Sequence, residues 1–146
     1  QQLLRGWQVW LIGSQEDARI TAEISGTGSP YLYDLAGRTR LEDVVDLLSV
    51  ASCVISNDSG LMHVAAAVDT PVIALFGSTS PKINPPLRPR ATILWRELSC
   101  SPCHQRSCPL GHTNCLHEVS VDQVLEALTR ATTAPNHTDS IPRIRL

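Results

Sequence analysis

The chain has 146 residues, 42% of them hydrophobic, and a formal net charge of −2 at pH 7. A chain of this length supports one domain with a sizeable core, whereas its mixed charges provide no basic stripe for nucleic acid. No apolar run approaches the roughly 20 residues that a membrane span requires. We therefore expect a domain over residues 1–131, a polar tail over 132–146, no nucleic-acid partner and no membrane span.

Short apolar runs alternate with amphipathic stretches along the chain. Strands are predicted at residues 8–12, 31–34, 53–55, 72–76 and 91–95, and helices at residues 16–24, 41–51, 59–68 and 120–130. Within 41–51, Leu41, Val44 and Leu48 recur at helical spacing. Because strands and helices alternate, the sequence predicts an α/β, Rossmann-like fold, in which a parallel sheet carries helices on both faces.

Four short polar turns follow four of these predicted strands. They are Gly13-Ser14-Gln15-Glu16, Gly37-Arg38-Thr39, Asn57-Asp58-Ser59-Gly60 and Gly77-Ser78-Thr79. Parallel α/β sheets bind ligands at the carboxyl ends of their strands, so we expect the four turns to converge on one edge. That repetition favours a nucleotide site.

The third turn opens directly into a helix-favouring, alanine-rich run. Asp58 or Ser59 can act as the N-cap, and Gly60 lets a ligand approach the backbone because it has no Cβ. The first amides of a helix are unpaired and carry partial positive charge, which suits a phosphate. His63 follows one turn into the helix. The pattern predicts a phosphate-binding helix terminus with an imidazole beside it.

Three segments resemble the bacterial heptosyltransferases of glycosyltransferase family 9. They are residues 57–67, 74–81 and 35–39, within a likeness that covers residues 3–130. The resemblance implies the donor-binding, C-terminal half of a GT-B enzyme that catalyses inverting glycosyl transfer. It implies ADP-L-glycero-D-manno-heptose as donor and the lipopolysaccharide inner core as acceptor, the latter bound through an N-terminal domain that also supplies the catalytic carboxylate. We therefore expect this chain to bind donor without turnover, at the cytoplasmic face of the bacterial inner membrane, with no metal or cofactor in the reaction.

The resemblance also implies roles for individual residues. His63 and Asp58 are the candidates for a part in catalysis, and Ser59 and Gly60 for amide contacts to the diphosphate. The other candidates for substrate binding are Gly13, Ser14, Glu16, Asp17, Thr39, Gly77 and Thr79. Of these, Glu16 or Asp17 corresponds to the ribose-binding acid, and the sequence does not choose between them. Each residue also has a structural alternative, as an N-cap, a turn former or a packing residue.

A second group of chemically active residues lies between the last strand and the last helix. Cys100, Cys103, Cys108 and Cys115 follow the spacing C-x2-C-x4-C-x6-C. In a reducing cell such a group can hold zinc or an iron–sulfur cluster; the alternatives are free thiols or adventitious disulfides. Two other functions therefore stay open: a GT-B sugar-nucleotide epimerase half that binds a uridine nucleotide, and a metal-bearing interaction module without enzymatic activity.

Overall fold

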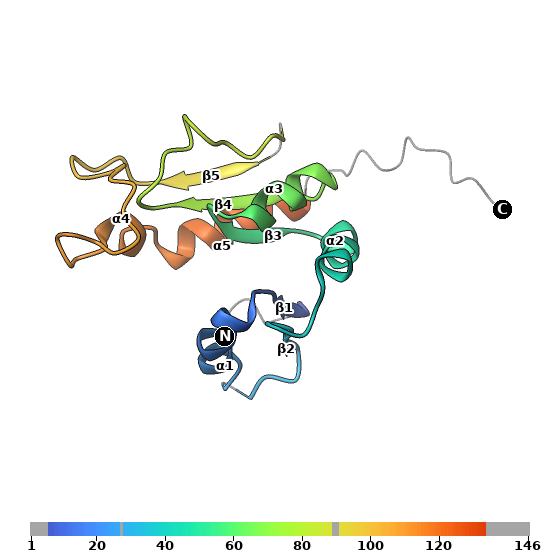
Figure 1. Ribbon diagram of the computed structural model, residues 1–146. Helices are drawn as coiled ribbons and strands as arrows, with labels where there is room; N and C mark the ends of the chain where they lie inside the picture. Colours follow the sequence, from blue (N-terminus) through green and yellow to red (C-terminus); the bar gives the residue numbers. More distant parts are fainter. Residues whose placement is uncertain (1–5, 27, 89–90, 134–146) are drawn as a thin grey trace. The chain divides into compact units, whose positions relative to one another are not determined.

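The computed structural model describes residues 6–26, 28–88 and 91–133 (Figure 1). The chain divides into two compact units, residues 1–49 and 50–146. Every strand pairing in both units is parallel, as the alternating pattern predicts. Among the described helices, none is long and apolar enough to cross a membrane.

The first unit contains a two-stranded ladder. β1 (Val9–Leu11) pairs with β2 (Leu32–Asp34) in the register Val9 to Leu32. A 3-10 turn (Gln15–Asp17) and α1 (Ala18–Ser25) connect the strands, where we predicted one helix over 16–24. This strand–helix–strand unit brings the turns after β1 and β2 together, since the Gly37 amide donates to the Gly13 carbonyl at 3.0 Å.

The second unit contains a three-stranded sheet in the order β3-β4-β5. β3 (Val54–Asn57) and β5 (Thr92–Trp95) flank β4 (Val72–Phe76). Four of the five β4 residues are at most 1% exposed. Since successive side chains of a strand point to opposite faces, both faces of β4 are covered.

Three helices complete the second unit. α3 (Gly60–Ala67) packs against β3 and β4, and α5 (Val121–Thr133) packs against β4 and β5 (Figure 1). The short α4 (Asn114–His117), which the sequence pattern did not predict, lies against the end of β4. These contacts confirm the predicted α/β class with parallel strands between helices.

The structure corrects three expectations, about the sheet, α2 and the tail, and most other element ends shift by one or two residues. We expected the strands to form one sheet, but the described strands pair in two ladders, because strand order depends on long-range pairing that local patterns do not encode. α2 (Leu41–Val50) ends one residue earlier than predicted. α5 continues through Thr133, so it takes in the first two residues of the predicted tail. The rest of that tail, residues 134–146, lies outside the described residues.

Candidate functional site

The turn between β3 and α3 leaves the start of the helix open. Ser59 is the N-cap residue, in extended conformation (φ −151°, ψ 167°), and Gly60 is the first helical residue. The Ser59 hydroxyl does not cap the helix; it lies 3.2 Å from the Ser56 hydroxyl. Gly60 is exposed, and a Cβ placed there would meet no atom within 4 Å. The Met62 amide already donates to the Ser59 carbonyl at 3.2 Å, so the open part of the turn is the exposed backbone at Gly60, where a phosphate could approach.

Asp58 is held in place by two contacts at the same turn. Its backbone amide donates to the Leu75 carbonyl at 3.2 Å, which fixes the turn against β4. Its carboxylate accepts from Asn84 Nδ2 at 3.4 Å. Asn84 comes from the loop after β4, and sequence reasoning missed it because the two residues are far apart in the chain. His63 lies half-buried in the first turn of α3, as predicted.

The turn after β4 lies at the same edge of the sheet. The register pairs Asn57 with Leu75, so the chain leaves β3 and β4 side by side. Gly77 is buried, and a Cβ there would approach Leu116 Cγ to 2.8 Å. Packing under Leu116 therefore explains why this position carries glycine, whatever its part in binding. Thr79 stays half-buried two residues farther along.

The first unit presents its own polar turn after β1. The backbone amide and the hydroxyl of Ser14 both donate to Asp17 Oδ2 at 2.7 Å. The Ser14 hydroxyl, followed by the Ser14 amide, lowers the pKa of the Asp17 carboxyl. A Cβ on Gly13 would come within 2.9 Å of Asp17. Asp17 therefore closes its own turn, whereas the neighbouring Glu16 is exposed.

Thr39 follows the turn after β2 in the first unit. The residue is half-buried, and its hydroxyl oxygen is buried without a hydrogen-bond partner among the described residues. Such an orphan donor carries a free-energy cost that a ligand can relieve. Within the first unit the structure thus joins the predicted turns after β1 and β2, and within the second unit the turns after β3 and β4. Convergence of all four turns stays a prediction.

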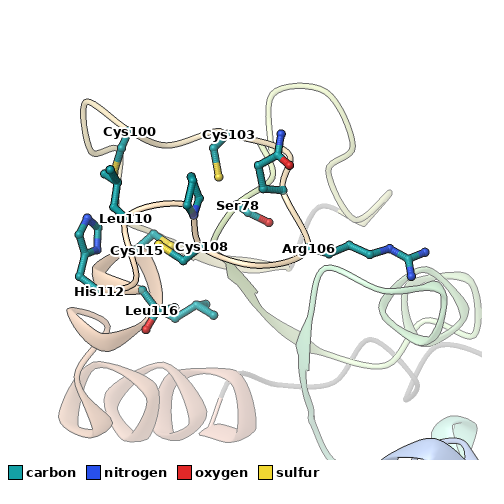
Figure 2. Close-up of a pocket in the computed structure, with 12 residues that line it drawn as sticks. Ser78, Cys100, Cys103, Arg106, Cys108, Leu110, His112, Cys115 and Leu116 are labelled. Atoms are coloured by element: carbon teal, nitrogen blue, oxygen red, sulfur yellow. The ribbon is translucent and has the colours of Figure 1, made fainter.

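The cysteine-bearing loop lies next to the turn after β4. Cys100, Cys103, Cys108 and Cys115 line one pocket together with residues that include Ser78 (Figure 2). All five cysteines of the chain are free. Among the described residues, no group of three or more His, Cys, Asp or Glu side chains forms a ready-made metal centre.

Comparison with known proteins places the chain in a family. The sequence model of glycosyltransferase family 9 (heptosyltransferase) matches residues 2–114. Lipopolysaccharide heptosyltransferase 2 of Salmonella typhimurium is 35% identical over 132 residues, which cover 88% of this chain and 38% of that protein. Lipooligosaccharide heptosyltransferase 2 of Haemophilus influenzae is 45% identical over 96 residues, which cover 63% of this chain and 28% of that protein.

A solved structure gives the same result. E. coli ADP-heptose LPS heptosyltransferase II superimposes with a TM-score of 0.76 and 33% identity, over 90% of this chain and 38% of that one. The chain thus spans well under half the length of the relatives it matches. The family match favours the glycosyltransferase over the epimerase alternative. The chain belongs to glycosyltransferase family 9, the heptosyltransferase family.

Proposed function

We propose that this chain is the donor-binding part of an inverting heptosyltransferase. Its donor is ADP-L-glycero-D-manno-heptose, and the longer protein adds the heptose to the lipopolysaccharide inner core. The observation that carries the proposal is the open start of α3, where Gly60 is exposed with open space at its Cβ position and His63 follows in the same turn. The names of the relatives support the donor and acceptor classes.

The chemistry of transfer explains why this terminus suits the donor. When the bond between heptose and diphosphate breaks, negative charge develops on the departing ADP. Amides at a helix start stabilise such charge by about 0.3–1 kcal/mol at an exposed site, and by more where water is excluded. His63 adds a hydrogen bond to a phosphate oxygen or a sugar hydroxyl. Asp58, held by Asn84, is assigned to hydroxyl groups because a diphosphate would repel its carboxylate.

The acceptor side of the reaction lies outside this chain in our proposal. The carboxylate that deprotonates the acceptor hydroxyl belongs to the N-terminal half of the longer protein, so this chain alone binds donor and does not turn it over. The longer protein acts at the cytoplasmic face of the inner membrane, where the growing inner core is exposed to soluble nucleotide sugars.

Nucleotide titration tests the proposal directly. We expect calorimetric titration of the full chain to show ADP binding at least about tenfold tighter than UDP, a difference of about 1.4 kcal/mol. Equal affinities, or a preference for UDP, would contradict the adenine-nucleotide donor. Failure to bind either nucleotide would contradict the phosphate site itself.

Replacing His63 with Ala should weaken binding of ADP-heptose by about 1–3 kcal/mol, because a hydrogen bond to a charged phosphate or a sugar hydroxyl is lost. The dissociation constant measured by calorimetry reports the change. His117→Ala provides a matched control, since His117 lies on α4 and is exposed. An unchanged dissociation constant in His63→Ala would remove this residue from the site.

Replacing Glu16 with Gln tests which acid binds the ribose. We assign that role to Glu16, because Asp17 already accepts two hydrogen bonds from Ser14. In the wild type, ADP should bind more tightly than 2′-deoxy-ADP, and Glu16→Gln should shrink this difference by about 1–2 kcal/mol. Asp17→Asn is the comparison. If Asp17→Asn removes the discrimination and Glu16→Gln leaves it intact, the assignment is reversed.

A further inference from the structure

The loop after β5 and the short α4 that follows it contain four of the five cysteines in the chain. Cys100, Cys103 and Cys108 lie in the loop, and Cys115 lies in α4. All four are half-buried and line the same pocket, and Figure 2 shows them around it with the Arg106 side chain extending away. The four cysteines therefore share the lining of one pocket, although the described side chains do not form a ready-made metal centre there.

The chain turns tightly between two of these cysteines. Gly111 has φ +72°, and the Gly111 amide donates to the Cys108 carbonyl at 3.1 Å. This turn reverses the chain between Cys108 and Cys115, and both residues line the same pocket. Cysteine binds metal ions as the thiolate, so the turn places two potential thiolate ligands on one pocket.

The remaining lining of the pocket offers no carboxylate to a hard cation. No aspartate or glutamate is among its lining residues, and the only histidine there, His112, already accepts a hydrogen bond at Nδ1 from the Asn114 amide at 3.0 Å. Mg²⁺ and Ca²⁺ require oxygen ligands, whereas sulfur ligands select Zn²⁺ and other soft or borderline ions. The donor set is thus a thiolate set.

We propose that Cys100, Cys103, Cys108 and Cys115 together bind one Zn²⁺-like divalent ion with four sulfur ligands. The ion completes the site when it binds, because the described side chains do not form a ready-made centre without it. Such coupling between metal binding and local order is usual for structural thiolate sites. This proposal concerns metal binding alone and does not depend on the proposed nucleotide donor.

The position of the loop indicates what the metal would stabilise. The Ser101 hydroxyl donates to the Gly77 carbonyl at 2.7 Å, and the His104 amide donates to the Ser78 carbonyl at 2.7 Å. Leu116, directly after Cys115, covers Gly77. The loop has no regular structure between β5 and α4, so a bound ion would fix it against the turn after β4.

Titration of the reduced full chain with Co²⁺ tests the proposal. We expect one Co²⁺ per chain, with the visible bands of tetrahedral coordination and strong thiolate-to-metal charge transfer, and complete displacement by Zn²⁺. Serine at any one of the four positions should weaken binding at least tenfold and reduce the charge-transfer intensity. Cys53→Ser is the matched control, since Cys53 lies outside the loop and burial raises its pKa to about 11.

Three results would overturn the proposal. The first is the absence of Co²⁺ binding, and the second is a Co²⁺ affinity that stays unchanged in each of the four single serine variants. The third is a loss of Co²⁺ binding in His112→Ala that is as severe as in the cysteine variants. A second measurement uses the wild type alone, so it tests the proposal even if the serine variants fail to fold. Zn²⁺ should slow alkylation of Cys100, Cys103, Cys108 and Cys115, as mapped by mass spectrometry, and leave the alkylation rate of Cys53 unchanged. Equal alkylation rates of the four cysteines with and without Zn²⁺ would also rule the site out.

Discussion

Replacing Gly60 with Asp should weaken ADP binding by about 3 kcal/mol, roughly a hundredfold, while the fold is preserved. A Cβ at Gly60 enters open space, so the new side chain causes no clash. It places a carboxylate where we locate the diphosphate, and two like charges about 5 Å apart repel by about 3 kcal/mol at an effective dielectric constant of about 20. Calorimetric titration with ADP measures the loss.

The same substitution separates binding from stability. An acidic residue in the first turn of a helix is stabilising by about 0.3–1 kcal/mol, so the melting temperature of Gly60→Asp should stay equal or rise. Gly60→Ala adds only the Cβ, without the charge, and should therefore weaken ADP binding less than Gly60→Asp does. If Gly60→Asp binds ADP as well as Gly60→Ala does, the diphosphate does not lie at the start of α3.

Replacing Phe76 with Ala should destabilise the chain by about 3–5 kcal/mol. Phe76 is the last residue of β4, is 0% exposed and pairs with Trp95 in β5. Truncation removes a large buried aromatic side chain and leaves a cavity next to the turn that begins at Gly77. Since small domains are stable by only about 5–15 kcal/mol, the loss is a large fraction of the total.

Urea denaturation measures this change as a shift in midpoint at unchanged slope. Leu87→Ala is the control, because Leu87 is 86% exposed and its truncation should change stability by less than about 0.5 kcal/mol. A loss below about 1 kcal/mol in Phe76→Ala would mean that β4 is not the centre of the core of the second unit.

Local residue chemistry predicts much of this protein. The apolar spacing that includes Val44 and Leu48 identifies α2, and both residues are buried. The β-branched run ended by Gly77 locates β4 with its observed bounds. The polar turn at Ser59 locates the start of α3, because an extended cap before alanine-rich sequence is a short-range signal. Family membership also follows from such local motifs.

Contacts between distant parts of the chain determine how the residues of these turns are held and packed. Asp58 is held by Asn84 from a distant loop, and Gly77 is glycine because Leu116 packs on it. The nearer pair of Asp17 and Ser14 also escaped prediction, because the choice between two adjacent acids depends on side-chain direction.

Propensity and spacing within a few residues are enough to predict the α/β class, the strand-end turns and the residue types at each turn. Which strands pair and which turns share an edge depends on contacts between segments far apart in the chain. The path of the folded chain also brings Cys100, Cys103 and Cys108 of the loop and Cys115 of α4 to the lining of one pocket. Local sequence patterns do not encode such packing.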